Sequence, residues 1–152
     1  NGIVVAGIDD VSVRFSKCCN PVPGDEIIGF VTRGRGVSIH RTDCINMMNL
    51  SEADRHRIIE AEWQVSSEGK DNELYDAEII IYANDRMGLL LEITKVFTEL
   101  KIDVKSMNIR TSKQGIATIN VGFAIRGVEA LHEVTKKVRQ IEGIKDIQRT
   151  QA

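Results

Sequence analysis

The chain has 152 residues, of which 42% are hydrophobic and 28% are charged, and its formal net charge is −2. This balance is typical of a folded soluble protein and argues against a disordered chain or a polybasic nucleic-acid-binding arm. No apolar run approaches the roughly 20 residues that a membrane-spanning helix needs, and the start, NGIVVAGIDD, lacks the basic flank and apolar length of a signal peptide. We therefore expect a cytoplasmic protein. Because there is no initiator Met, we also expect a piece of a longer one.

The apolar pattern divides the chain into two small modules. Residues 66–73 read SSEGKDNE and contain no apolar side chain, so we predict a linker over residues 66–74. This linker separates a module of residues 1–65 from a second module of residues 75–152, and together they predict an α+β fold. Domains of this size bury a limited fraction of their surface and often depend on a metal, a disulfide or a partner.

The first module alternates short strands with turns. The alternation of apolar and polar residues in VSVRF predicts a strand, and RGRG is typical of a hairpin turn. Thr42 is placed to cap a short helix that runs through Asp43 and Cys44. The predicted strands cover residues 11–15, 27–32, 37–40 and 58–63.

Three cysteines and one histidine of the first module have the spacing of a metal site. Cys18 and Cys19 are adjacent, His40 ends a predicted strand, and Cys44 follows in the first turn of the predicted helix. The pattern CC-x20-H-x3-C supplies three thiolates and one imidazole, which Zn²⁺ accepts in closed tetrahedral sites. We therefore predict a zinc site formed by these four residues, with Zn as the candidate cofactor.

Adjacent cysteines raise a geometric question, because neighbouring side chains on an extended strand point in opposite directions. Both can bind one ion only if the backbone turns between or just after them. Pro21 and Pro23 are the only prolines in the chain, and we expect them to make such a turn rigid. Three alternatives stay open: the cysteines are small core hydrophobes, Cys18 and Cys19 form a vicinal disulfide, or one of them is a nucleophile with His40 as its base.

The second module has the element order βαββαβ. EIIIYAN is rich in β-branched residues and predicts a strand, and the following helix has one apolar face. Asp85 is placed to cap that helix. Right-handed crossovers fold this order into a ferredoxin-like, four-stranded antiparallel sheet with both helices on one face. The apolar face of the first helix comprises Leu89, Leu90, Ile93, Val96, Phe97 and Leu100.

One face of the predicted sheet has no helix over it. Thr118, Asn120 and Gly122 point to that face, which invites a ligand, a second copy of the module, or RNA. The RNA-recognition motif shares this topology, but the strand IATINVGF lacks its stacking aromatics, since Phe123 belongs to the core-facing set. We therefore do not expect bases to stack on this sheet.

The loop NDRMGLL enters the first helix of the second module through a glycine. Free backbone N–H groups around Gly88 would meet a carboxylate at the positive end of the helix, and Gly88 lets a ligand come close. The alternative is that Gly88 serves only tight packing and Asp85 only the helix cap. The candidate effector contacts are Asn84, Asp85, Arg86, Met87, Gly88 and Leu89.

With its βαββαβ order and its NDRMGLL loop, the stretch of residues 75–149 resembles an ACT domain. This resemblance implies a regulatory module that pairs its sheet with a second copy and binds small effectors, often amino acids, at the loop between its first strand and first helix. We therefore expect a sensor that forms a homodimer, rather than a catalyst. A branched-chain amino acid is the candidate ligand.

Residues 13–44 contain CCNPVPGD, GRGVSIHR and DC, and an ACT-like stretch follows them. In this order and spacing they closely resemble the zinc-finger-like, ribosome-intersubunit domain of long Rel-type (RelA/SpoT) proteins, which synthesise and hydrolyse the alarmone (p)ppGpp. The resemblance implies the regulatory C-terminal region of a GTP pyrophosphokinase. The residues for synthesis and hydrolysis lie in other domains of such proteins, so we expect no catalysis by this chain.

The same resemblance implies the partners. In such proteins this region docks on stalled ribosomes that carry uncharged tRNA, touches large-subunit ribosomal RNA, and relays that state to the protein's own catalytic domains. Arginines near the predicted metal site suit bidentate contact with phosphates, and the alternative is that they are solvated surface charges. The candidate RNA contacts are Lys17, Arg33, Arg35 and Arg41.

Overall fold

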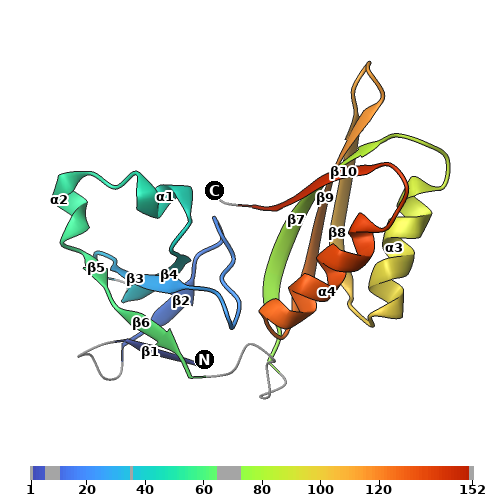
Figure 1. Cartoon of the computed structure of the whole chain (residues 1–152). Coiled ribbons are helices and arrows are strands. Elements are labelled where there is room, and N and C mark those ends of the chain that lie inside the picture. Colours follow the sequence, from blue (N-terminus) through green and yellow to red (C-terminus); the bar gives the residue numbers. More distant parts are fainter. Residues whose placement is uncertain (1, 6–10, 35, 65–72, 151–152) are drawn as a thin grey trace.

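Two modules of mixed α and β structure lie side by side in this computed structural model, which describes residues 2–5, 11–34, 36–64 and 73–150 (Figure 1). The amino-terminal module (residues 2–64) and the carboxyl-terminal module (residues 73–150) have separate sheets. The predicted α+β fold is confirmed. The predicted linker falls mostly on residues outside this description, and its last two members, Glu73 and Leu74, are exposed.

The helices and strands follow the chain order shown in Figure 1. The amino-terminal module contains β1 (Ile3–Val5), β2 (Val13–Phe15), β3 (Ile27–Val31), β4 (Val37–Arg41), α1 (Ile45–Met48), α2 (Glu52–Arg55), β5 (Ile58–Ile59) and β6 (Ala61–Trp63). The carboxyl-terminal module contains β7 (Tyr75–Asn84), α3 (Leu89–Glu99), β8 (Val104–Thr111), β9 (Ile116–Ile125), α4 (Val128–Arg139) and β10 (Ile144–Arg149). Within these described parts, no helix has the length and apolar character to cross a membrane.

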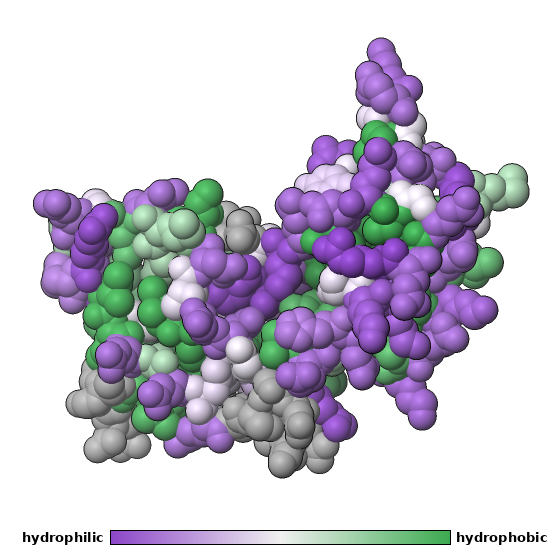
Figure 2. Space-filling view, viewed as in Figure 1, coloured by the Kyte–Doolittle hydropathy of each residue, from purple (hydrophilic) through white to green (hydrophobic). Residues whose placement is uncertain are grey.

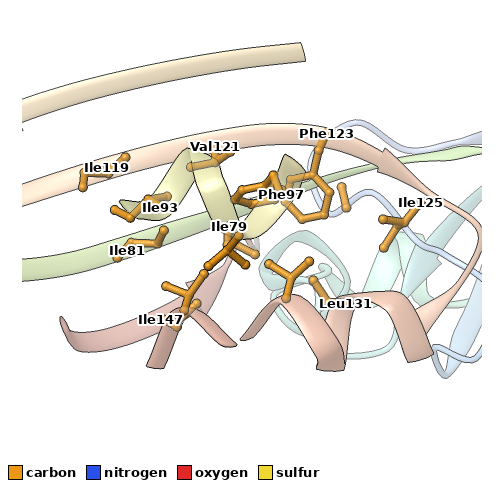
Figure 3. Packing of buried hydrophobic residues seen from close by; sticks show 14 of the residues in the cluster. Ile79, Ile81, Ile93, Phe97, Ile119, Val121, Phe123, Ile125, Leu131 and Ile147 are labelled. Atoms are coloured by element: carbon orange, nitrogen blue, oxygen red, sulfur yellow. The ribbon is translucent and has the colours of Figure 1, made fainter. Parts of the chain in front are cut away.

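The carboxyl-terminal sheet has the strand order β10-β7-β9-β8, and each neighbouring pair is antiparallel. Side chains along β7 and β9 alternate between buried and partly exposed, because successive residues of a strand point to opposite faces. The buried set packs under α3 and α4 (Figure 3), where the rings of Phe97 and Phe123 lie 5.0 Å apart between centroids. The predicted ferredoxin-like βαββαβ fold is therefore confirmed.

The start of α3 differs from its prediction in two ways. The helix begins at Leu89 with Gly88 as its N-cap in the left-handed region (φ 81°), and no side chain of the described residues caps it. The predicted cap, Asp85, lies too far upstream, and its backbone N–H instead donates to the Gly115 carbonyl at 2.8 Å. Leu90 is 37% exposed although it was assigned to the apolar face. One helical residue turns the side chain by about 100°, so Leu90 falls off the face that Leu89 begins.

The sheet face opposite the helices carries Thr118, Asn120 and Gly122, as predicted. Gly122 fits tightly there, because a Cβ atom at its position would lie 2.5 Å from the Ser106 hydroxyl oxygen on β8. The side-chain oxygen of Asn120 is buried without a hydrogen-bond partner among the described residues. Pairing of this face with a second copy of the chain stays a prediction.

The amino-terminal module is built on a sheet of order β2-β4-β3-β5, in which β2 runs parallel to β4 and the other pairs are antiparallel. One face of this sheet presents Val37 and Ile39 to a small core. A separate pair of strands, β1 and β6, contributes Ile3, Val5 and Ala61 to the same core.

Two predictions for the amino-terminal module need correction. Residues 58–63 form two strands rather than one, because Ile59 pairs with β3 while Ala61 already pairs with β1. Thr42 does not cap α1, which begins at Ile45 with Cys44 as N-cap and without a side-chain cap bond. The Thr42 hydroxyl lies instead 3.5 Å from the Glu26 carboxylate.

The hairpin between β3 and β4 provides a test of this fold. Gly34 and Gly36 both have positive φ (77° and 83°), but a Cβ at Gly36 would collide with the Ser12 carbonyl oxygen, whereas a Cβ at Gly34 would meet nothing within 4 Å. Gly34→Ala should cost about 1 kcal/mol for its backbone conformation alone. Gly36→Ala should cost about 3 kcal/mol, because the clash also disturbs β2. Urea unfolding of the two variants measures both costs, and equal values would contradict the close approach of Gly36 to Ser12.

Candidate metal centre

Three segments of the amino-terminal module bring together the four residues predicted as metal ligands. Cys18 and Cys19 lie in the loop after β2, His40 lies on β4, and Cys44 is the N-cap of α1. Their ligand atoms all lie within 4.8 Å of one another. The Cys18 Sγ atom is 3.4 Å from both His40 Nδ1 and Cys44 Sγ, and Cys19 Sγ is 3.9 Å from His40 Nδ1.

These separations match the edges of a zinc tetrahedron. With Zn–S bonds of about 2.3 Å and a Zn–N bond of about 2.0 Å, two sulfurs lie about 3.8 Å apart and a sulfur and a nitrogen about 3.5 Å apart. The donor set of three sulfurs and one imidazole nitrogen is one that structural zinc sites use. The separations of 3.4, 3.4 and 3.9 Å lie within about 0.4 Å of these values, and all four ligand atoms lie within 4.8 Å of one another, so the cluster could bind a metal ion if its widest pairs closed by up to about 1 Å.

The two adjacent cysteines lie on a tight turn that brings both thiols to the cluster. This turn lies before the prolines, which were expected to brace it. The backbone N–H of Asn20 donates to the Ser16 carbonyl at 3.0 Å, and Asn20 adopts a left-handed conformation with φ 48°. The chain thus reverses across the two cysteines rather than after them. Pro21 and Pro23 follow this turn and are buried, and the Pro23 carbonyl accepts a hydrogen bond from the Val128 N–H of the carboxyl-terminal module.

Hydrogen bonds around the cluster orient its ligands. The Ser38 hydroxyl lies 3.1 Å from His40 Nε2, so Nε2 can donate to Ser38 and leave Nδ1 free to ligate. The backbone N–H of Arg41 donates to Cys19 Sγ at 3.3 Å, and the Ser16 hydroxyl lies 2.8 Å from Cys18 Sγ. Such donors favour thiolate over thiol.

Burial controls the protonation of the metal-free cluster. It raises the pKa of Cys19 to about 12, against the opposing effect of the Arg41 backbone N–H, and it also raises the pKa of Cys44. Burial acts in the same direction on Cys18, but hydrogen bonds from neighbours including Ser16 outweigh it and the Cys18 pKa is lowered. Burial lowers the pKa of His40, which keeps the imidazole neutral. Metal binding must therefore displace protons from Cys19 and Cys44.

Arg41 is one of the predicted RNA contacts, but the folded chain encloses its side chain. Only 4% of the residue is exposed. Its guanidinium donates to the Cys19 and Thr150 carbonyls at 2.9 and 3.1 Å and makes two bonds, of 2.8 and 2.9 Å, to the Asp43 carboxylate. The basic residue next to a metal ligand thus has a structural role, because the folded chain surrounds it with acceptors.

The other predicted RNA contacts have different placements. Lys17 and Arg33 are exposed, on the cysteine turn and on the β3–β4 hairpin, and Arg35 lies outside the described residues. The structure adds Arg14, an exposed residue of β2 that lines a hollow of about 260 Å³ together with Lys17 and Ser38. The alternation of VSVRF could have identified Arg14, because Val13 and Phe15 occupy the opposite face.

Interactions within the carboxyl-terminal module engage two residues of the predicted effector loop, residues 84–89. The Leu89 N–H donates to the Arg86 carbonyl at 3.3 Å, and the Arg86 guanidinium donates to the Glu142 carbonyl at 3.2 Å and forms an ion pair with Glu92. These bonds engage groups that a ligand carboxylate would need. Leu89 is buried, and the exposed members of the loop are Asn84, Asp85, Met87 and Gly88. Binding of a branched-chain amino acid stays a prediction.

Two protein families match the two modules. Residues 3–64 match the RelA/SpoT RIS domain, and residues 71–149 match the ACT domain. Their order in the chain agrees with the resemblances seen in the sequence.

Curated relatives cover almost the whole chain. It is 40% identical over 148 residues to a GTP pyrophosphokinase of Streptomyces coelicolor and 36% identical over 148 residues to one of Escherichia coli K12. Each match takes in 97% of this chain but only 17% and 19% of the respective relative. Among solved structures, the crystal structure of the ACT domain from GTP pyrophosphokinase of Chlorobium tepidum matches 51% of this chain and 99% of its own, with 23% identity and a TM-score of 0.46.

Proposed function

Since the chain belongs to the RelA/SpoT family, we propose that its RIS and ACT domains form a regulatory region of a GTP pyrophosphokinase. The observation that carries this proposal is the pairing of the two domains along nearly the whole chain. The chain spans less than a fifth of the length of the curated relatives quoted above. Synthesis and hydrolysis of (p)ppGpp are therefore proposed for the whole protein, in the cytoplasm, and this chain contributes control rather than chemistry.

We further propose that the amino-terminal module is held together by zinc. Cys18, Cys19, His40 and Cys44 would hold the ion, which would cross-link the cysteine turn, β4 and the start of α1. A structural ion suits a module whose own core is small, since metal binding adds directly to folding stability. Three of the four ligands are buried, so the ion would have no open position for substrate.

The basic side chains of this module support docking on ribosomal RNA. Arg14 and Lys17 are exposed on and just after β2, which is the edge strand of its sheet. Arg33 is exposed on the hairpin that leads into β4, the strand that pairs with β2. Arginines on a rigid edge and a protruding turn suit phosphate contact. A local basic edge on a chain of net charge −2 fits recognition of folded RNA by shape.

Sensing of amino acids is the second candidate function. The ACT match supports it, but the loop of residues 84–89 has its Leu89 N–H and its Arg86 side chain engaged within the module. By contrast, the basic edge of the amino-terminal module, formed by Arg14, Lys17 and Arg33, is already exposed. The geometry therefore favours docking on the ribosome over binding of a small effector.

Zinc should be present in protein purified without chelator, at about one ion per chain by elemental analysis. His40→Gln should lose most of this zinc because it removes one of four ligands, whereas His56→Gln is the matched control, since His56 is exposed on the same module. Binding to the metal-free protein at pH 7 should release at least two protons, from Cys19 and Cys44, whose pKa values are raised. Equal zinc contents in both histidine variants would contradict the assigned ligand set.

Docking should depend on the basic edge. In a pelleting assay with bacterial ribosomes that carry uncharged tRNA, Arg14→Glu with Arg33→Glu should weaken binding and reduce the slope of log affinity against log salt by about two, because two phosphate contacts are lost. The control is Arg110→Glu with Lys113→Glu, which makes the same charge change on the hydrophilic β8–β9 hairpin that protrudes from the carboxyl-terminal module (Figure 2). If both double variants bind like the parent chain, the docking edge is elsewhere.

A further inference from the structure

We propose that metal binding in the amino-terminal module and docking of that module on the carboxyl-terminal module are coupled, so that the arrangement of the two modules responds to metal occupancy. The coupling element is the cysteine loop, defined as residues 16–25, together with Arg41. This inference rests on the proposed metal site and is independent of docking on the ribosome.

The cysteine loop contacts both modules, through different residues. Cys18 and Cys19 point into the metal cluster. A few residues later Val22 is fully buried within the hydrophobic core of the carboxyl-terminal module. The Pro23 carbonyl accepts a hydrogen bond of 2.8 Å from the backbone N–H of Val128, the first residue of α4. This loop therefore completes a helix start and a core that belong to the other module.

Arg41 ties the metal ligands directly to the end of β10. One nitrogen of its buried guanidinium donates both to the carbonyl of Cys19 and to the carbonyl of Thr150. Its backbone N–H donates to the sulfur of Cys19. Figure 1 shows β10 running from the carboxyl-terminal module toward the amino-terminal module at this point. A change in the position of Cys19 thus acts on the strand end that lies across the interface.

An ion pair fixes the far end of the cysteine loop. Arg149 on β10 donates to both carboxylate oxygens of Asp25, at 2.6 and 3.0 Å, and to the carbonyl of Asn20 at 3.0 Å. The same Asp25 carboxylate accepts the backbone N–H of Val22 at 2.8 Å. The side chains of Asp25 and Arg149 are only 9% and 19% exposed, so water screens this pair weakly. Arg149 therefore shapes the loop that presents the cysteines.

Three aromatic rings complete the interface. Phe15 stacks on Trp63 within the amino-terminal module, and both meet the ring of Tyr75, the first residue of β7, edge to face at 5.5 and 5.6 Å. The indole N–H of Trp63 donates to the Asp25 carbonyl at 3.1 Å. Trp63 is the only tryptophan of the chain and packs against the cores of both modules, so its fluorescence reports on the interface together with the adjoining amino-terminal core.

Metal binding and docking of the two modules both require the cysteine loop to be ordered, and this shared requirement couples them. A metal ion needs the cysteine loop in one conformation, and so do Val22, Asp25 and the Pro23 carbonyl when they meet the carboxyl-terminal module. Fixing a loop costs conformational entropy, and whichever event occurs first leaves less of that cost to the second. Thermodynamic linkage makes this effect reciprocal. Undocking of the modules must weaken the metal affinity by the same factor by which metal removal weakens docking of the modules.

The test compares the zinc affinity of the 152-residue chain with those of two variants, measured by competition with a chromogenic chelator. Arg149→Gln breaks the buried contacts with Asp25 and Asn20 without touching a ligand, and it should weaken zinc binding at least fivefold. Arg139→Gln is the matched control, because Arg139 makes an exposed ion pair of 3.9 Å with Asp146 on the same module. Its zinc affinity should equal that of the parent chain.

A second measurement covers the case in which Arg149→Gln fails to fold. Removal of zinc from the parent chain by chelator should shift the emission of Trp63 to longer wavelength, since the loosened interface admits water to the ring. Equal zinc affinities in folded Arg149→Gln and Arg139→Gln, or unchanged Trp63 emission on metal removal, would overturn the coupling. Failure of the parent chain to pellet with ribosomes, with the coupling intact, would instead count against the proposed docking function alone.

Discussion

The whole arrangement depends on one turn, which a hydrogen bond from Asn20 to Ser16 closes across the two adjacent cysteines. In an extended strand the two thiols would point to opposite sides. Within the turn both sulfurs reach His40 on β4, and Cys44 at the start of α1 joins them. The cluster therefore links three segments of a module whose described core has only five buried residues. Just after this turn, Val22 lies in the core of the carboxyl-terminal module and the Pro23 carbonyl bonds the Val128 N–H.

Sequence patterns could predict the carboxyl-terminal module almost completely. The alternating residues of β7 and β9 and the apolar spacing of α3 and α4 each mark the side of the element that faces the core. They failed where the outcome depends on contacts between distant segments. Arg41 looks like a surface cation in the sequence, yet the Thr150 carbonyl that it bonds lies in the last described stretch of the chain. The prolines looked like a brace for the thiols, but Pro23 serves an interface that no local pattern reveals.

The metal cluster was foreseeable for a different reason. Ligand chemistry restricts which residue types can meet, so the spacing of three cysteines and one histidine indicates a common point even when the backbone path is unknown. The path itself was not predictable: the left-handed conformation of Asn20 and the parallel pairing of β2 with β4 are products of the folded module. The orienting hydroxyl of Ser38 likewise becomes meaningful only when β4 places it beside His40.

We propose that Cys18, Cys19, His40 and Cys44 form one zinc site in the amino-terminal module. X-ray absorption spectroscopy at the zinc edge, on the zinc-loaded chain, tests it most directly. We expect three sulfur ligands at about 2.3 Å and one nitrogen ligand at about 2.0 Å. A first coordination shell dominated by oxygen or nitrogen, or one with fewer than three sulfurs, would contradict it.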